Sequence, residues 1–202
     1  LIRMGFEIAE TRNGAPADGV RRVSCIDKSN VTRGCQLFRS TFDEVASDYP
    51  ATEADYGYID AFMQWITRSP EHYDTVVTSN MFGDISTDLG AVLQGGMGMA
   101  ASGNIGDEHA FFEPVHGSAP KHAGKNKVNP IASINSIQMM MDYLGRKTND
   151  DDLIAVGHLI DESVADHLKH GKMLTYDIGG TASCSDVGIS IAERLATKLK
   201  ER

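Results

Sequence analysis

Two aspartates, Asp84 and Asp88, have the spacing in this chain that points most directly to chemistry. They follow the apolar run 75–78 and lie in a helical pattern that continues to Leu93. In a helix that begins near Phe82, residues four apart share one face, so the two carboxylates are stacked one turn apart and repel each other. A divalent cation held by oxygen ligands offsets that repulsion. The alternative is a solvated acidic helix face, and the residues alone leave both interpretations open.

A second stretch of chemical side chains runs from Phe111 to Pro130. Its pattern predicts a strand that leads into a loop with two histidines, His116 and His122, and three lysines among small residues. This composition suits backbone amides and cations that meet a phosphate-bearing ligand. A single loop histidine is more often structural or merely exposed, so the whole string carries the prediction and its parts do not.

The composition sets the class of protein. A chain of 202 residues with 41% hydrophobic content is long enough to bury a core. A formal charge of −9 argues against nucleic-acid or membrane partners, which require a basic face. No apolar run reaches the length of a membrane span and no signal peptide is recognised, so we expect a cytoplasmic protein. Three widely spaced cysteines fit core or surface thiols in a reducing compartment.

The elements that must position these residues alternate between strands and helices. Strands are predicted at 22–27, at 56–59 and through Val77, and helices at 1–10, 31–46, 62–66 and 82–93. Three further amphipathic helices are predicted at 131–144, 153–168 and 187–199. This alternation predicts an α/β protein.

The glycine-rich, nearly uncharged segment 94–106 interrupts this alternation, and we predict a domain boundary or hinge at its start. Within it, residues 96–101 formally match a dinucleotide-binding fingerprint. That fingerprint needs a strand before it and a helix after it. Here a helix precedes and a loop is predicted to follow, so we reject the match.

Five motifs follow one another along the chain: Asp27 to Val31, Tyr58 to Asp60, Asn80 to Asp88, Glu113 to Pro130 and Asp177 to Ala182. In this order they resemble the motifs of the metal-dependent β-decarboxylating dehydrogenases, the family of 3-isopropylmalate, isocitrate, homoisocitrate and tartrate dehydrogenases. The resemblance implies a two-lobed, isopropylmalate dehydrogenase-like α/β fold in which the N-terminal part of the larger domain is absent. It implies a smaller, dimer-forming lobe at 1–94 and the C-terminal part of the larger, cofactor-binding lobe at 95–202.

The resemblance also implies roles for four charged residues. Asp84 and Asp88 match the acids with which one subunit binds Mg²⁺ or Mn²⁺, and Asp60 matches the acid that the neighbouring subunit adds. Lys28 matches the catalytic lysine, which also reaches across the interface; without the family it would be taken for a surface lysine. The implied assembly is a homodimer with shared active sites, or a tetramer.

A cofactor site is implied by the same resemblance. Its residues match the family's cofactor loop and the positions that meet the adenosine part of the nucleotide: His116, Gly117, Ser118, Ala119, Pro120, Lys121, His122, Val128, Asn129, Tyr176 and Asp177. Relatives that use NAD place an aspartate where this chain has Lys121, and a lysine suits the 2′-phosphate of NADP. We therefore predict NADP over NAD, although Gly180 stands where NADP-dependent isocitrate dehydrogenases often carry arginine.

The expected reaction is oxidative decarboxylation of a malate-type 2-hydroxy acid, similar to 3-isopropylmalate, with hydride transfer to NAD(P). Isocitrate, homoisocitrate and tartrate stay open as substrates. An alternative interpretation of another class is that the chain is a non-catalytic or truncated subunit of such an enzyme. Retention of Lys28, Asp60, Asp84 and Asp88 favours the enzyme, because a subunit relieved of catalysis has no need of clustered acids that repel one another.

Overall fold

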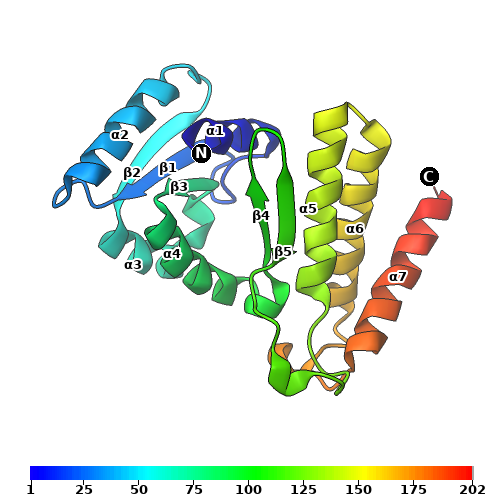
Figure 1. Ribbon diagram of the computed structural model, residues 1–202. Helices are drawn as coiled ribbons and strands as arrows, with labels where there is room; N and C mark the ends of the chain where they lie inside the picture. Colours follow the sequence, from blue (N-terminus) through cyan, green and yellow to red (C-terminus); the bar gives the residue numbers. More distant parts are fainter. Residues whose placement is uncertain (202) are drawn as a thin grey trace. The chain divides into compact units, whose positions relative to one another are not determined.

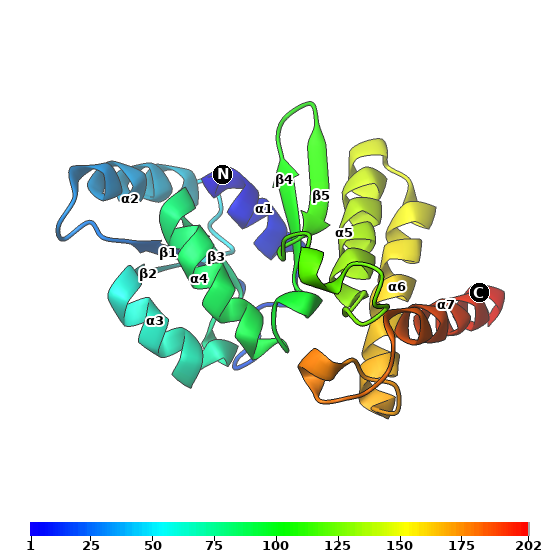
Figure 2. The ribbon, with the colours of Figure 1, turned by 60° about the horizontal axis from the view of Figure 1, so that its bottom comes forward.

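The computed structural model describes residues 1–201, which form two compact units (Figures 1 and 2). The N-terminal unit is Leu1–Gly90, and the C-terminal unit begins at Ala91. The N-terminal unit contains α1 (Ile2–Thr11), β1 (Arg22–Asp27), α2 (Arg33–Ala46), β2 (Glu53–Tyr58), α3 (Ile59–Arg68), β3 (Thr75–Thr78) and most of α4 (Asn80–Leu93). The C-terminal unit contains β4 (Ala101–Ile105), β5 (Ala110–Pro114), α5 (Ile131–Thr148), α6 (Asp151–His170) and α7 (Cys184–Glu201).

A three-stranded parallel sheet forms the centre of the N-terminal unit, with the strand order β2-β1-β3. Every residue of β1 is buried. A central parallel strand is covered on both faces, which explains the nearly continuous burial. The register pairs Asp27 with Tyr58, so β1 and β2 end side by side. Parallel pairing therefore brings the residues that follow both strands to one edge of the sheet.

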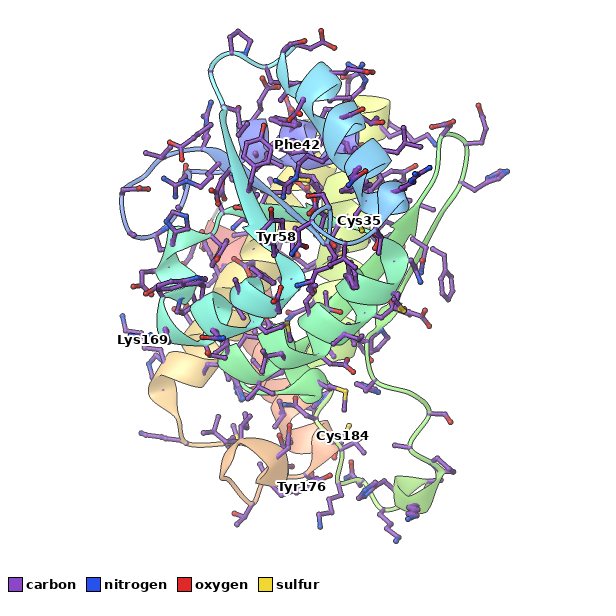
Figure 3. The ribbon with its side chains drawn as sticks, turned by 90° about the vertical axis from the view of Figure 1, so that its left-hand side faces the viewer. Cys35, Phe42, Tyr58, Lys169, Tyr176 and Cys184 are labelled. Atoms are coloured by element: carbon purple, nitrogen blue, oxygen red, sulfur yellow. The ribbon has the colours of Figure 1, made fainter. Side chains whose placement is uncertain are left out.

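Helices cover both faces of this sheet. On one face, α1 and α2 bury Val23 and Cys25 together with the rings of Phe6 and Phe42, whose centroids lie 5.3 Å apart. Figure 3 labels Phe42 on α2. On the other face α3 packs against β1 and β2. Side chains that alternate along a strand thus reach different helices.

The ends of the helices differ from the sequence-based boundaries for local reasons. The helix expected from residue 31 begins at Arg33, because Thr32 is its N-cap and accepts a hydrogen bond from the backbone N–H of Cys35 at 3.3 Å. The helix expected at 62–66 begins already at Ile59, directly after β2 ends at Tyr58. Asp60 consequently lies in the first turn of α3.

In the C-terminal unit a β-hairpin and three helices pack together. The hairpin pairs β4 with β5 in antiparallel register and lies against α5, which packs along α6, and α6 contacts α7. Its core consists of Met99, Ile131, Val164, Val187 and Ile191. The prediction of a loop through residue 106 is wrong from Ala101 onward, where β4 begins. Before β4, Gly95 and Gly96 have backbone φ angles of 111° and 103°, which residues other than glycine rarely adopt.

The thiols agree with the sequence analysis. Cys25 is buried, Cys35 and Cys184 are half-buried, and all three are free. Within residues 1–201, none of the helices combines the length and apolar character that crossing a membrane requires.

Candidate active site

Lys28 and Asp60 meet at the edge of the sheet where β1 and β2 end. The Lys28 ammonium donates a hydrogen bond to Asp60 Oδ1 at 2.5 Å. Asp60 lies in the first turn of α3, where the helix dipole favours a negative charge. The hydrogen bond from Lys28 holds the pKa of Asp60 below its usual value. These two predicted site residues are therefore brought together as an ion pair within one chain.

Asp84 and Asp88 lie four residues apart on the exposed side of α4. Asn80 Nδ2 donates to Asp84 Oδ2 at 3.1 Å, while Asp88 has no hydrogen-bond or ion-pair partner among residues 1–201. Two carboxylates without a basic partner form a donor set that fits a hard divalent cation. No group of three His, Cys, Asp or Glu side chains that could hold a metal ion occurs in the described part of the chain. A metal ion bound between Asp84 and Asp88 would therefore need further oxygen ligands besides these two carboxylates.

The predicted cofactor loop follows β5. The backbone N–H of Val115 donates to Ala100 O at 3.0 Å, which fixes the start of the loop beside β4. His116 Nδ1 lies 2.8 Å from Gly117 O, while Gly117 and Ser118 are exposed. Ala119 has a φ of 44°, a conformation uncommon for residues other than glycine. A short 3₁₀ helix, Pro120–His122, follows.

Asn126 attaches the far side of this loop to the start of α7. Its φ is 50°, its Nδ2 donates to Ser185 Oγ at 2.7 Å, and its Oδ1 accepts from the Ser185 backbone N–H at 3.0 Å. The backbone carbonyl of Asn126 accepts from the Cys184 N–H at 2.9 Å. The loop is therefore held at both ends. The sequence analysis did not single out Asn126, although an asparagine between two lysines is a turn signal.

Asn129 and Asp177, which are 48 residues apart, meet in the C-terminal unit. Asn129 Nδ2 donates to Asp177 Oδ2 at 3.1 Å, and Asn129 Oδ1 accepts from the N–H of Ile131, the first residue of α5, at 3.0 Å. Gly98 packs against both residues, since a Cβ there would lie 2.7 Å from Asp177 Oδ2 and 3.0 Å from Asn129 Cβ. Gly98 is a residue that the sequence analysis missed. Val128, directly before Asn129, is half-buried.

Three side chains gather beside the loop. The rings of His122 and Tyr176 stack with centroids 6.0 Å apart, and Lys127 Nζ lies 4.3 Å from the centre of the Tyr176 ring. Figure 3 labels Tyr176 on the segment between α6 and α7. His122 Nδ1 is buried without a hydrogen-bond partner in the part of the chain that the structure describes. A buried ring nitrogen beside exposed Lys121 suits a polar or anionic ligand group.

Position 180 has no room for a side chain. A Cβ on Gly180 would lie 1.9 Å from Leu174 O and 2.3 Å from Leu174 C. Both are backbone atoms, so a small rotation of a side chain cannot relieve the overlap. The arginine that often stands here in NADP-dependent isocitrate dehydrogenases therefore does not fit this loop.

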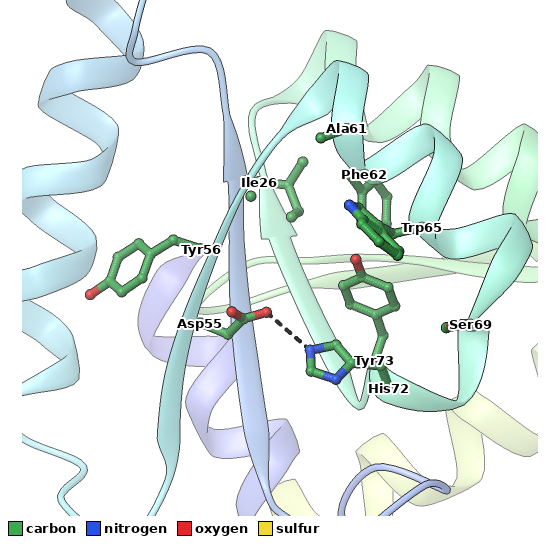
Figure 4. Close-up of a pocket in the computed structure, with 10 residues that line it drawn as sticks. Ile26, Asp55, Tyr56, Ala61, Phe62, Trp65, Ser69, His72 and Tyr73 are labelled. Atoms are coloured by element: carbon green, nitrogen blue, oxygen red, sulfur yellow. Dashed lines mark ion pairs between the residues drawn. The ribbon is translucent and has the colours of Figure 1, made fainter.

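The N-terminal unit also contains a hollow. It has a volume of about 410 Å³ and is lined by β2, α3 and the segment around His72 (Figure 4). The Asp55 carboxylate in its wall is already engaged, because it accepts a hydrogen bond from Ser24 Oγ at 2.8 Å and lies 3.5 Å from His72 Nε2. None of the predicted site residues lines it. We assign it no catalytic role.

Fold and site define a class of α/β protein with charged side chains at the carboxyl edge of a parallel sheet and a separate loop suited to phosphates. The chain belongs to the family described as isocitrate/isopropylmalate dehydrogenase, whose sequence model matches residues 1–191.

Individual relatives agree with this assignment. A homoisocitrate dehydrogenase of Methanocaldococcus jannaschii is 43% identical over 99% of this chain and 54% of its own length. An NADP isocitrate dehydrogenase of Thermus thermophilus is 39% identical over 89% of this chain and 34% of its own. The crystal structure of a β-decarboxylating dehydrogenase from Thermococcus kodakarensis matches with a TM-score of 0.84 and 37% identity, over 98% of this chain and 55% of that one. The chain thus spans about half the length of its relatives or less.

Proposed function

We propose that this chain supplies the base, the metal ligands and the cofactor loop of an enzyme that oxidatively decarboxylates a malate-type 2-hydroxy acid. The substrate is 3-isopropylmalate-like, with isocitrate, homoisocitrate and tartrate as alternatives. The observation that carries the proposal is the ion pair between Lys28 and Asp60, formed within a unit that also presents Asp84 and Asp88 without a basic partner among the described residues. All four of these charged residues lie in the N-terminal unit, which supports the proposal.

Each of these residues has a defined task. Asp84 and Asp88 would hold Mg²⁺ or Mn²⁺, and the chemistry that this ion would supply when bound is polarisation of the substrate's hydroxyl group and later of its ketone. Lys28 accepts the hydroxyl proton, directly or through a water molecule. The loop that contains His116 to His122, together with Asn129 and Asp177, would hold the nicotinamide cofactor, which would supply the hydride acceptor; the 3-carboxylate would then leave as CO₂, with a proton taking its place on carbon. A cation held by Asp60 would weaken the ion pair between Asp60 and Lys28, and its positive charge would favour the neutral amine that a base requires.

The proposed assembly is a homodimer in which Lys28 and Asp60 of one subunit complete the acid pair of the other. Two observations support it. The acid pair has no third His, Cys, Asp or Glu beside it among the described residues of its own chain, and Met81 and Ile85, which are 64% and 55% exposed, lie on the same side of α4 as Asp84 and Asp88. Exposed apolar side chains beside a binding site are typical of a protein interface.

The dimer is tested by the molecular mass in solution. We expect Ile85→Lys to produce a monomer that has lost activity. Leu37→Lys is the matched control, because Leu37 is 68% exposed on α2, far in sequence from the acid pair. A monomeric wild-type protein, or a dimeric Ile85→Lys variant with full activity, would contradict the proposal. A tetramer of such dimers remains an alternative.

The proposed cofactor is NADP in preference to NAD. Lys121 is exposed at the loop and can pair with a 2′-phosphate, with the stacked rings of His122 and Tyr176 beside it. Because position 180 does not accept arginine, the lysine has to carry most of this recognition.

Cofactor choice is tested by the ratio of kcat/KM for NADP to kcat/KM for NAD. We expect Lys121→Asp to lower this ratio by about 10- to 100-fold, the value of one charge-assisted hydrogen bond. Lys125→Asp, in the same loop, serves as the control for general loss of charge. A wild-type preference for NAD would refute the role of Lys121.

The decisive assay uses the complete protein with isopropylmalate, isocitrate, homoisocitrate and tartrate, each with both nicotinamide cofactors and Mn²⁺. Activity with one of the four acids supports the proposal and identifies the substrate. Activity with none would favour the second candidate, a non-catalytic subunit. A cytoplasmic location stays a prediction.

A further inference from the structure

We propose that Asp27, Arg39 and Tyr58 form a positioning set that fixes the side chain of Lys28 against Asp60. This inference rests on the proposed function, because it assigns the three residues to the same reaction. None of them is among the predicted site residues. The argument follows a chain of contacts that begins in the core and ends at the Lys28 ammonium.

The chain of contacts starts at a buried carboxylate. The side chain of Asp27 is 2% exposed and forms a two-pronged ion pair with Arg39, from Nε to Oδ2 at 2.7 Å and from Nη2 to Oδ1 at 3.0 Å. Asp27 Oδ1 also accepts a hydrogen bond from the Ser29 backbone N–H at 2.8 Å. A buried carboxylate with several donors has little freedom to move. Asp27 therefore fixes the backbone on both sides of Lys28 and the guanidinium of Arg39 together.

Arg39 in turn holds an aromatic ring. Its Cζ lies 5.4 Å from the centre of the Tyr58 ring and 5.2 Å from that of Tyr56. A guanidinium at this distance is attracted to the ring quadrupole and stacks on aromatic side chains. The Tyr58 ring thus has a defined place at the end of β2, although it is 39% exposed.

The Tyr58 ring meets the base. Lys28 Nζ lies 5.8 Å from the centre of this ring and 2.5 Å from Asp60 Oδ1. Two cations, Lys28 and Arg39, therefore contact the same ring, and the Lys28 ammonium is located by the ring and the carboxylate together. The Tyr58 hydroxyl has no hydrogen-bond partner in residues 1–201, so the ring alone carries this role.

The physical reason for such a set is the length of the lysine side chain. A lysine has four rotatable bonds and much conformational entropy, so a base on this stem is poorly located unless other groups restrict it. Misplacement of a catalytic group by about 1 Å can lower a rate by about 100-fold. The Tyr58 ring, which the ion pair of Asp27 and Arg39 holds in place, restricts the side chain of Lys28 while its ammonium stays bonded to Asp60.

The test compares Tyr58→Leu with Tyr58→Phe in the complete protein. We expect Tyr58→Leu to lower kcat by about 10- to 100-fold with unchanged KM for the nicotinamide cofactor, since only the base is misplaced. Tyr58→Phe keeps the aromatic ring, so its kcat should stay close to that of the wild-type protein. Trp65→Leu is the matched control: its ring also has a cation beside it, Arg68 Cζ at 5.6 Å, and among the described residues that cation is Arg68 and not Lys28. Full activity of Tyr58→Leu, or equal loss in Tyr58→Phe, would overturn the proposal.

A second readout does not depend on turnover. The ε-methylene protons of Lys28, assigned by their disappearance in Lys28→Arg, should show a ring-current shift in a protein with ¹³C-labelled lysine. We expect this shift to persist in Tyr58→Phe and to vanish in Tyr58→Leu. If the wild-type protein is inactive with every acid, the proposed function fails, and the shift still decides the inference. Identical Lys28 signals in the wild-type protein and Tyr58→Leu would refute it.

Discussion

The loop that carries Tyr176 and Asp177 depends on the absence of a side chain at position 180. A methyl group on Gly180 would lie 1.9 Å from Leu174 O, whereas ordinary contacts of this kind lie at 3.4–4 Å. A Cβ is fixed to the backbone of residue 180, and it overlaps backbone atoms of Leu174. Relief therefore requires the backbone around residue 180 to move away from Leu174 by more than about 1 Å. We therefore expect Gly180→Ala to open this loop.

The cost follows from the hydrogen bonds that close the loop. The Gly180 N–H donates to Thr175 O at 2.9 Å, and the Ala182 N–H donates to Leu174 O at 2.9 Å. Each such bond contributes about 0.5–1.5 kcal/mol net. Loss of both predicts that Gly180→Ala lowers the free energy of unfolding by about 1–3 kcal/mol, the usual cost of an overpacked site. The KM for the nicotinamide cofactor should rise as well, because Tyr176 and Asp177 lie inside the loop.

Urea denaturation of wild-type and variant proteins measures this loss. Gly188→Ala is the matched control, because a Cβ there meets nothing within 4 Å and the residue lies inside α7. We expect that control to gain about 0.5–1 kcal/mol, since glycine weakens a helix relative to alanine. A Gly180→Ala protein as stable as the wild type would refute the steric reasoning. It would also reopen position 180 to the arginine that the present backbone rejects.

Three further predictions concern the core, a buried histidine and the acid pair. Phe42→Ala should lower the free energy of unfolding by about 3–5 kcal/mol, because Phe42 is fully buried against Phe6; urea denaturation measures the loss, and a change below about 1 kcal/mol would contradict the packing. Burial lowers the pKa of His167 below its ordinary 6.5. At a pH near or below 6.5 the unfolded chain therefore binds a proton at this histidine more readily than the folded protein does, and the free energy of unfolding should fall as the pH drops from about 7.5 to about 5.5. His167→Asn should show a smaller fall, and an equal fall would show that other groups cause it. Asp88→Asn should raise the Mn²⁺ concentration for half-maximal activity by at least about tenfold, because affinity follows the number of charged ligands; an unchanged Mn²⁺ titration would remove Asp88 from the metal site.

Local patterns in the sequence were sufficient for much of the fold. The strand at 22–27 and the helices around Phe42, Ile131, Val164 and Ile191 all appear in the structure, because long apolar periodicity reports directly which side of an element is buried. The stacking of Asp84 and Asp88 follows from helical spacing alone. The rejected dinucleotide fingerprint is indeed preceded by α4 and followed by β4.

The segment 94–106 shows where local patterns fail. Its glycines, alanines and serines have weak strand propensity, and β4 forms only because β5 pairs with it and Gly103 lets Phe112 and Met139 approach closely. A Cβ at position 103 would lie 3.0 Å from Met139 Sδ and 3.1 Å from the Phe112 ring. The strand β4 therefore depends on contacts with β5 and α5, which a local stretch of sequence does not reveal.

The types of the charged residues and the order of the motifs were fixed by the sequence itself, and with them the family. Tertiary structure alone decided which residues meet. Lys28 and Asp60 are 32 positions apart, and they touch because parallel pairing of β1 with β2 sets Asp27 opposite Tyr58. Shifting that register by one residue would move the end of one strand by about 3.3 Å relative to the other and so displace the residues that follow the two strands. The ring between Lys28 and Arg39 follows from the same register, which is why the positioning set became visible only in three dimensions.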